Sequence, residues 1–484
     1  MSTATLPGQW IAGTWVDPGD DRESTNPAEP VDVVARFGIA SADHVDAAVS
    51  AASTAARSWH RLGGVERGRI LHRVADELSA RTDELADLLV REEGKTRSEA
   101  VGELERGMDT LHYNAARALA PTGESFDSAD RGRVVQTRRV PVGVVAVITP
   151  WNFPVAIPIW KLAPALAHGN TVVWKPSELV PAISVLLTEV IAGAGVPNGV
   201  VNTLVGDQST GTHLVAHADV AAITFTGSVP TGQAILAAAG PRGARIQLEL
   251  GGHNPALVFG DADLDRAATD IVAGAMGSTG QKCTATRRVL VASAVHDDLR
   301  DRILARAGAL RIGPGSDPAT DLGPVVSADS RDRILRAVEV AVDQGATALT
   351  PTGRPDQAGD GWFVRPTVLA GQPDLDICRE EVFGPVTTLL PFDDDDEAFR
   401  LANATPYGLS AAVHTRSAAR VRRALEEVDA GLVTVNGPTT GADLHVPFGG
   451  VKASSGPGGR EMGEAAREFF TETRTAYLDR DLAP

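Results

Sequence analysis

The chain has 484 residues, of which 43% are hydrophobic and 22% are charged, a composition typical of a folded globular protein. Its 62 acidic and 45 basic residues give a formal net charge of −17, which argues against nucleic acid and anionic lipid surfaces as partners. The length exceeds that of one compact core, so two or three structural units are expected.

The chain carries two cysteines, too few for a disulfide framework, and a reactive thiol needs a reducing compartment. Residues 1–9 lack the basic and apolar regions of a signal peptide, so a cytoplasmic protein is predicted. Residues 140–160 hold no charge and could span a bilayer, but four prolines oppose a continuous helix there. We therefore expect a buried strand over 142–148 that runs into a loop.

In the first quarter of the chain, residues 10–16 predict a short hairpin with a glycine turn, followed by a polar loop through Asn26 and Pro27. Ser41 is suited to cap a helix with one apolar stripe, and a second helix of the same period is predicted over 65–92. The stripes consist of Val45, Ala48, Ala52, Ala55 and Trp59 in the first helix and Leu71, Val74, Leu78, Leu85 and Leu89 in the second.

The helical pattern breaks at residues 123–141. Within this segment, residues 134–140 predict an exposed strand. A long exposed strand edge needs a partner if it is not to promote aggregation, so we expect subunits to associate.

From Pro141 to Gly251 strands alternate with helices, which predicts a doubly wound parallel sheet of Rossmann type. The usual Gly-x-Gly-x-x-Gly fingerprint is missing, and Gly193-Ala194-Gly195 follows a helix, where it is suited to end it. Strands are expected at 142–148, 171–174, 200–205, 221–225 and 245–250, with helices at 159–167, 182–194, 210–216 and 232–239.

A second alternating unit extends from Ala256 to about Lys452. The acidic run 393–397 is expected to cap and start a helix, and no metal site is predicted. Two candidate catalytic side chains lie in different units, with Glu249 at the end of the first and Cys283 in the second. The active site is therefore expected in a cleft between the two units. Strands are expected near 256–259, 289–291, 346–349, 387–392, 410–414 and 432–436.

Three side chains suggest chemistry. Cys283 lies among small residues, Glu249 ends an alternating strand before two glycines, and Asn152 stands in a proline-stiffened loop. A thiolate can attack an electron-poor carbon, an amide can stabilise the resulting oxyanion, and a carboxylate can take a proton from water. Each also has an ordinary structural reading: a buried thiol, a strand-end ion pair and a turn asparagine. Together they fit oxidation or hydrolysis of an acyl group.

These three segments resemble the aldehyde dehydrogenase superfamily, in its NAD(P)-dependent, non-acylating branch. Further segments are similar to family motifs and follow the same order. They are Val173 to Glu178, Thr224 to Gly232, Glu380 to Pro385 and Pro447 to Lys452.

The resemblance implies an α/β fold with two doubly wound parallel-sheet domains, a Rossmann-type cofactor domain and a catalytic domain, and a β-arm for oligomerisation. Residues 1–122 and 142–251 would form the cofactor domain and residues 252–452 the catalytic domain. Residues 123–141 and 466–484 would form the arm, with a C-terminal strand at about 468–478. A homodimer or homotetramer is expected.

By resemblance, Cys283 is the nucleophile, which forms a thiohemiacetal and then a thioester. Glu249 is the general base for hydrolysis of that thioester, and its presence distinguishes the chain from relatives that transfer the acyl group to coenzyme A. The amide of Asn152 contributes to the oxyanion hole.

The family also implies the cofactor residues. A carboxylate at Glu178 accepts hydrogen bonds from ribose hydroxyls and repels a 2′-phosphate, which favours NAD over NADP, although relatives with this motif use both. The sequence around Gly227 predicts a helix that begins at Gly232, suited to a pyrophosphate. The full set is Trp151, Lys175, Glu178, Gly227, Ser228, Gly232, Glu381 and Phe383.

The glycine-rich segment 453–463 departs from the commoner family spacing. Together with residues 154–161, 175–181 and 436–447, it is most similar to α-ketoglutaric semialdehyde dehydrogenases. Lys282 either attracts such an anionic substrate or faces solvent, and His253 is assigned no role. Other semialdehydes, aliphatic or aromatic aldehydes stay open, as do an acylating or thioesterase-like enzyme and an inactive binding protein. Trp160, His445 and Phe448 are candidate pocket walls.

Overall fold

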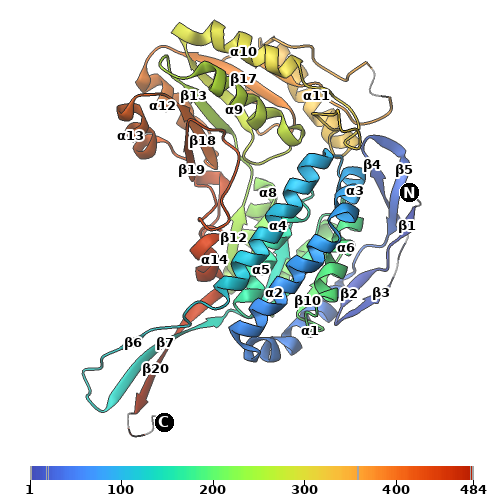
Figure 1. Cartoon of the computed structure of the whole chain (residues 1–484), viewed down its shortest axis with the longest axis vertical. Coiled ribbons are helices and arrows are strands. Elements are labelled where there is room, and N and C mark those ends of the chain that lie inside the picture. Colours follow the sequence, from blue (N-terminus) through green and yellow to red (C-terminus); the bar gives the residue numbers. More distant parts are fainter. Residues whose placement is uncertain (1–2, 18, 20, 357–358, 480, 482–484) are drawn as a thin grey trace.

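The computed structural model describes residues 3–17, 19, 21–356, 359–479 and 481. It shows two α/β units, with a long β-arm projecting from the lower one (Figure 1). The predicted arm segment 466–484 extends beyond the description at residues 480 and 482–484, and the predicted domains likewise include undescribed positions at 1–2, 18, 20 and 357–358.

Seven strands form the first sheet, in the order β12-β11-β8-β9-β10-β2-β3. The five strands predicted from the alternating pattern are present and mutually parallel, and the predicted hairpin is added at one edge in antiparallel pairing. The strands are β8 (Val144–Ile148), β9 (Thr171–Lys175), β10 (Val201–Thr203), β11 (Val220–Thr226), β12 (Arg245–Glu249), β2 (Gln9–Ile11) and β3 (Thr14–Val16).

Helices cover both faces of this sheet, which is why its central strands are buried throughout. Successive residues of β8 face different cores: Val145 and Val147 face one core and Val144 and Ala146 the other. One face carries α1 (Ala42–Arg61), α7 (Gln208–Ala216) and α8 (Val229–Ala239), and the other carries α2 (Gly63–Ala80), α4 (Arg97–Arg117), α5 (Ala156–Ala167) and α6 (Pro181–Gly193).

The predicted helix over 65–92 was wrong in one respect, because it is two helices, α2 and α3 (Thr82–Glu92). The backbone leaves the helical region at Arg81, and the Thr82 hydroxyl donates to the carbonyl of Ser79 at 2.9 Å. A threonine that bonds backbone carbonyls in this way competes with helix continuation. The apolar stripe continues on both sides of the break, so the periodicity did not reveal it.

The predicted polar loop through Asn26 and Pro27 was also wrong. A turn there joins β4 (Arg22–Asn26) to β5 (Glu29–Phe37), and β1 (Ala4–Thr5) completes a three-stranded sheet. Ser41 caps α1 as predicted, with its hydroxyl accepting from the backbone N–H of His44.

The second sheet also has seven strands, in the order β15-β16-β17-β14-β13-β18-β19, all parallel except β15. The six predicted strands are present, and β16 was not predicted. Asp394 caps α12, which confirms the reading of the acidic run. The strands are β13 (Asn254–Val258), β14 (Thr286–Ala292), β15 (Thr347–Ala348), β16 (Thr367–Ala370), β17 (Val386–Phe392), β18 (Ser410–His414) and β19 (Leu432–Val435), with helices α9 (Leu264–Met276), α10 (His296–Gly308), α11 (Ala328–Asp343), α12 (Asp395–Asn403) and α13 (Ala418–Glu427).

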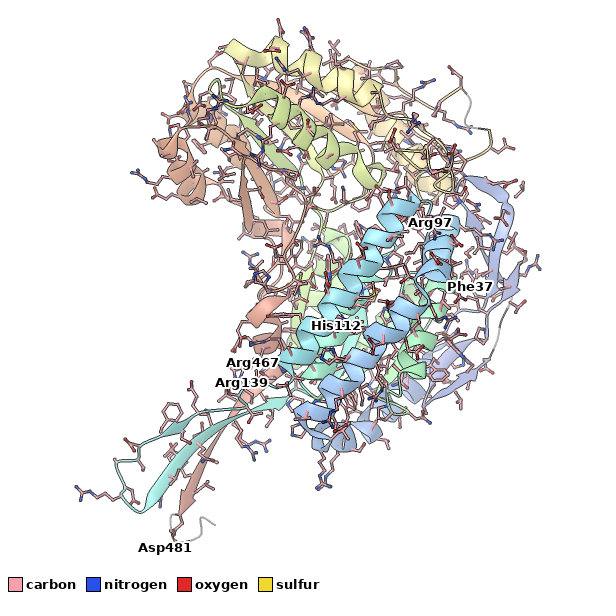
Figure 2. The ribbon with its side chains drawn as sticks, in the orientation of Figure 1. Phe37, Arg97, His112, Arg139, Arg467 and Asp481 are labelled. Atoms are coloured by element: carbon pink, nitrogen blue, oxygen red, sulfur yellow. The ribbon has the colours of Figure 1, made fainter. Side chains whose placement is uncertain are left out.

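The arm consists of β6 (Ser125–Phe126), β7 (Arg133–Pro141) and β20 (Thr471–Asp479). Figure 2 shows Arg139 and Arg467 at its base and Asp481 at its far end. The predicted C-terminal strand starts later than expected, because Gly463–Phe470 forms helix α14, whose Phe469 and Phe470 are buried in the first core.

No helix in the described ranges is both long enough and apolar enough to cross a membrane. In the uncharged segment 140–160, β8 runs into a loop as expected and α5 begins at Ala156.

Candidate active site

The segment before Cys283 has an unusual backbone. Ser278 and Thr279 both have φ of 53°, and Gly280 has φ of 65°. Such left-handed conformations are costly for non-glycine residues and persist where surrounding contacts hold them. The Ser278 N–H donates to Glu99 at 2.6 Å, and the Thr279 hydroxyl donates to the carbonyl of Gly323 at 3.1 Å. The loop 278–283, called the nucleophile loop after the predicted role of Cys283, is therefore held in a strained conformation by distant parts of the chain.

Polar side chains fix the loop on the other side of the thiol. The Asn254 amide donates to the carbonyls of Cys283 and Ala285 at 2.8 and 2.9 Å. Thr439 donates to the carbonyl of Thr284 at 2.7 Å. These bonds orient the Cys283 backbone and hence its sulfur.

Cys283 is partly exposed to a cavity of about 470 Å³. Desolvation, together with the charges of Glu381, Glu249 and Glu461, raises the pKa of its thiol to about 12. At neutral pH the resting side chain is a thiol, so catalysis requires a base for its proton.

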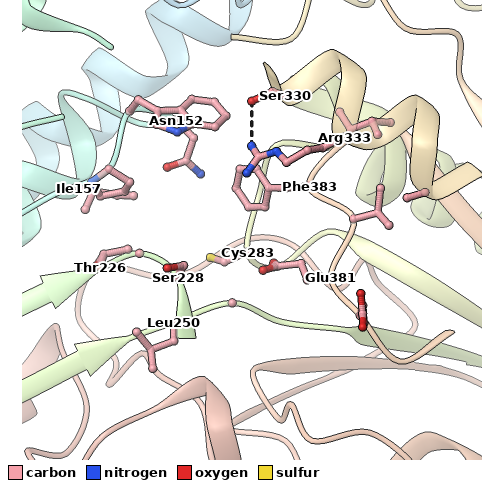
Figure 3. A pocket seen from close by; sticks show the side chains of 18 residues that line it. Asn152, Ile157, Thr226, Ser228, Leu250, Cys283, Ser330, Arg333, Glu381 and Phe383 are labelled. Carbon is pink, nitrogen blue, oxygen red and sulfur yellow. Dashed lines mark hydrogen bonds between the residues drawn. The ribbon is translucent and has the colours of Figure 1, made fainter. Parts of the chain in front are cut away.

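Asn152 lies in the same cavity, and Figure 3 shows its amide on the side that faces the Cys283 sulfur. Its nitrogen donates to the Gln281 carbonyl at 2.8 Å, while its oxygen is buried and accepts no bond from the described residues. Since the amide has two N–H groups, one is left for an oxyanion.

Glu249 is buried at the end of β12, next to Gly449. One carboxylate oxygen accepts from Gln247 at 3.2 Å, and the other is buried without a donor from the described residues. Burial first, then the neighbouring charge of Glu461, raises the pKa of Glu249 well above its usual value. The alternative reading of Glu249, a strand-end ion pair, is therefore not what the described residues show.

A buried polar chain extends from Glu249 to a second glutamate. Gln247 contacts the Thr224 hydroxyl, which accepts from Lys161 at 3.0 Å, and Lys161 pairs with Glu461 at 2.7 Å. Lys161 and Glu461 are 300 positions apart in sequence, so sequence reasoning missed them. The one available signal was a lysine within the otherwise apolar helix α5.

The cavity at Cys283 adjoins a second cavity of about 500 Å³ beside β9 and α8. Pro150, Thr226 and Gly227 line both, so the two form one extended cleft. Such a cleft at the carboxyl ends of parallel strands has the shape that a dinucleotide requires.

The predicted cofactor residues are distributed along this cleft. Lys175 and Glu178 line the second cavity, where burial lowers the pKa of Lys175. Glu381 and Phe383 line the first, where burial raises the pKa of Glu381 to about 7. The ring of Phe383 packs edge-on against Trp151 with centroids 5.6 Å apart.

The predicted start of a helix at Gly232 was wrong. Helix α8 begins at Val229 with Ser228 as its N-cap, because the Ser228 hydroxyl accepts from the Thr231 N–H at 3.4 Å. A Cβ at Gly232 would lie 2.7 Å from a Leu250 methyl, so this glycine permits close packing of helix on strand. Gly227 and Ser228 stay at the helix N-terminus, facing the cleft.

His253 has a structural position. It is buried, its Nε2 lies 3.1 Å from the Ile377 carbonyl, and burial beside Arg288 lowers its pKa to about 3. The adjacent Gly252 N–H donates to Glu381 at 3.1 Å. Gly252 and His253 thus contact the segment 377–381 at both of its ends, which fixes the position of Glu381.

The candidate substrate residues divide into two groups. Trp160 and Phe448 lie together, with ring centroids 6.2 Å apart, in a cluster that also contacts Cys283. His445 is exposed, and its neighbour Leu444 packs against this cluster instead. Lys282 does not line the Cys283 cavity; its ammonium lies beside Gly277, where burial lowers its pKa to about 8.

Helix α11, which sequence reasoning did not connect with the site, also lines the first cavity, with Ser330, Arg333, Ile334 and Ala337. Figure 3 shows Arg333 extending into it, where its guanidinium donates to Ser330 at 3.1 Å. An arginine in a helical repeat of charges carries no sequence signal that distinguishes it from a solvated one.

Comparison with known proteins agrees with this geometry. Residues 15–476 match the model of the "Aldehyde dehydrogenase family". The chain is 41% identical over 474 residues to the alpha-ketoglutarate semialdehyde dehydrogenase of Haloferax volcanii, covering 97% of this chain and 98% of the relative. It is 41% identical over 475 residues to the alpha-ketoglutaric semialdehyde dehydrogenase of Bacillus subtilis, covering 97% of each. A crystal structure of Staphylococcus aureus betaine aldehyde dehydrogenase with NAD⁺ superposes with a TM-score of 0.94 at 32% identity, covering 99% of this chain and 95% of that one.

Proposed function

Because the chain belongs to the aldehyde dehydrogenase family, we propose that it oxidises an aldehyde to a free carboxylic acid with Cys283 as nucleophile, Glu249 as base and Asn152 as oxyanion donor. One observation carries this assignment. A protonated thiol and a free amide N–H line one cavity, and a buried carboxyl of raised pKa, Glu249, directly precedes Leu250 and Gly251 in the wall of that cavity.

In the first step, the Cys283 thiol releases its proton to solvent water, which is the proton of the net reaction, and the sulfur bonds to the aldehyde carbon. The carbonyl oxygen becomes an oxyanion, which the Asn152 amide and the backbone N–H of Cys283 stabilise. Bound NAD supplies the hydride acceptor for the next step, which leaves a thioester on Cys283.

Glu249 then takes a proton from water, whose oxygen attacks the thioester carbon, and the C–S bond breaks to release the acid. The proton held by Glu249 passes to the departing sulfur, which restores the Cys283 thiol and the Glu249 carboxylate. The net reaction converts aldehyde, NAD⁺ and water into acid, NADH and a proton. The buried polar chain to Lys161 and Glu461 supports Glu249 by balancing charge around a carboxyl that changes protonation state.

For the cofactor, the lining residues support NAD. Glu178 would accept the adenosine ribose hydroxyls, with Lys175 beside it at 4.0 Å. Ser228 and the α8 N-terminus, together with Arg333, would face the diphosphate, and Glu381 with Phe383 would hold the nicotinamide end. The relative crystallised with NAD⁺ supports the same choice.

For the substrate, α-ketoglutaric semialdehyde is the best candidate. The two relatives at 41% identity are named after this substrate. The segments 154–161, 175–181 and 436–447 also resemble enzymes of that name. We further propose that the chain forms a homodimer or homotetramer, since strand β20 of the arm is largely exposed, with Tyr477 66% and Leu478 42% accessible. A cytoplasmic location is proposed because a reactive thiol needs a reducing compartment.

The test is NADH absorbance with a panel of aldehydes, each offered with NAD and with NADP. The panel holds α-ketoglutaric semialdehyde, succinic semialdehyde, an aliphatic and an aromatic aldehyde. We expect the anionic semialdehydes with NAD to give the highest kcat/KM, and a free acid as product without coenzyme A. Preference for neutral aldehydes would refute the substrate, and a requirement for coenzyme A would refute the hydrolytic role of Glu249.

A further inference from the structure

Arg106, on helix α4, pairs with no carboxylate of the described residues. It is partly buried, and one guanidinium nitrogen donates to the backbone carbonyl of Ala442. No carboxylate among the described residues lies within ion-pair distance of it. In a chain with 62 acidic residues and 45 basic ones, a guanidinium kept clear of acids is available for another anion.

The position of Arg106 on α4 is informative, because it continues a polar stripe that touches the active site. Glu99 accepts from Ser278 in the nucleophile loop, and Glu103 accepts from the N–H groups of Val155 and Ala156 at the start of α5. Arg106 follows Glu103 by three residues, so it lies on the same face of the helix. Figure 2 shows this helix running between the labelled Arg97 and His112.

Glu103 is not available to neutralise Arg106, although it is close along the helix. Its carboxylate is bonded to Lys95, and both side chains are fully buried. Lys95 in turn donates to the carbonyl of Asn152 at 3.0 Å. The stripe therefore uses its carboxylates to hold the catalytic loops and leaves the guanidinium with unused donors.

The contact with Ala442 places Arg106 beside the apolar cluster that Cys283 also packs against. Ala442 packs against the cluster of Leu409, Phe448 and Met462, and so does Cys283. Trp160 and Leu444 border the same cluster. A substrate whose aldehyde carbon meets the Cys283 sulfur, and whose chain lies along these apolar groups, would bring its far end toward the 442 segment.

Lys282, the other cation near the nucleophile, is placed differently. Its ammonium lies 3.0 Å from where a Cβ on Gly277 would be, under the influence of Glu99. It lies at the start of the nucleophile loop rather than against the apolar cluster.

We propose that Arg106 is the anion subsite of the enzyme, and that it binds the carboxylate at the far end of an acidic semialdehyde. A guanidinium offers two parallel donors that match a carboxylate, and the apolar walls beside it reduce competition from water. The inference rests on the proposed function, because it requires an anionic aldehyde as substrate.

The test compares Arg106→Met and Arg106→Lys with wild type on succinic semialdehyde and α-ketoglutaric semialdehyde against butanal and pentanal. Loss of a charged hydrogen bond predicts a fall of about 10- to 100-fold in the ratio of kcat/KM for anionic over neutral aldehyde in Arg106→Met. Arg106→Lys keeps the positive charge but lacks the two parallel N–H donors of the guanidinium, so it should give an intermediate ratio. Product inhibition by α-ketoglutarate should weaken in the same order.

Arg97→Met is the matched control, because Arg97 is on the same helix but pairs with Asp83 and Asp87 at the surface. It should leave the ratio unchanged. An equal loss on both substrate classes in Arg106→Met, or a retained preference for anions, would overturn the inference. A wild type that prefers neutral aldehydes would instead overturn the proposed substrate, and thermal unfolding of each variant separates both results from misfolding.

Discussion

The two halves of the cleft are built in different ways. The half beside β9 and α8 consists of strand ends and a helix N-terminus, elements that follow from the alternating pattern of the chain. The half around Cys283 depends on a strained loop held by residues from α4, β13 and the 439 segment. The strand and helix order alone is enough to form the nucleotide half of the cleft. The half around Cys283 depends in addition on specific side-chain hydrogen bonds from distant parts of the chain.

The largest effect should come from the nucleophile. Cys283→Ala should reduce turnover at least about 10³-fold, because no other thiol among the described residues lines the cleft. Cys378→Ala is the control, since that thiol is buried in the second core. NADH formation measures both, and substantial activity in Cys283→Ala would rule out the covalent mechanism.

Glu249→Gln should separate the two chemical steps. We expect a first burst of NADH near one equivalent per site and then a steady rate lower by roughly 10²- to 10³-fold, because the thioester lacks its base. Stopped-flow absorbance resolves burst from steady state, and acid-quenched protein should carry the acyl group in its mass spectrum. Full steady-state turnover would contradict the assigned role.

The strained loop predicts a large effect of a single methyl group. A Cβ on Gly280 would lie 2.0 Å from the Gly384 carbonyl oxygen, so Gly280→Ala should destabilise the fold and displace Cys283. Gly243→Ala is the matched control, because its φ of 74° is similar but nothing lies within 4 Å of the new Cβ. We expect a cost of about 1–2 kcal/mol for the control and more for Gly280→Ala, measured by chemical unfolding. An equal loss of unfolding free energy in the two variants would show that the Cys283 loop adjusts to the added methyl group.

The buried chain predicts a shift in pH dependence. The charge of Glu461 contributes to the raised pKa of Glu249, so Glu461→Gln should lower that pKa. The base form of Glu249 would then persist to lower pH, and the acid limb of the kcat profile should move in that direction. A profile that is unchanged on the acid side would show that the charge of Glu461 does not affect the titration of Glu249. The Tm of the variant measures how much stability is lost with the Lys161–Glu461 ion pair.

The smallest effect belongs to the other half of the cleft. Glu178→Gln should reduce the preference for NAD over NADP by roughly tenfold, because the carboxylate no longer repels a 2′-phosphate. Since Glu178 is 44% exposed in its side chain, solvent screens part of the effect. KM values for both cofactors measure it, with Glu189→Gln as a control on the outer face of α6.

Much of this comparison could be predicted from sequence. Both sheets followed from alternation, and the proposal of Cys283, Glu249 and Asn152 as catalytic residues came from their segments. The helix break at Arg81 did not, because apolar periodicity continued through it. The contact from Arg106 to Ala442 joins residues 336 positions apart, and Lys161 to Glu461 spans 300. Such pairs arise when separate units close over one another, and local patterns contain no information about that closure.

The raised pKa of Cys283 has a consequence for the lifetime of the enzyme. An aldehyde-processing cell compartment contains electrophiles and oxidants that consume thiolates, whereas the protonated thiol reacts slowly with both. Burial and the neighbouring acidic groups raise the pKa of Cys283, which favours the thiol over the thiolate in the idle enzyme. The same desolvated pocket that demands a base during turnover therefore protects the sulfur from inactivation between turnovers.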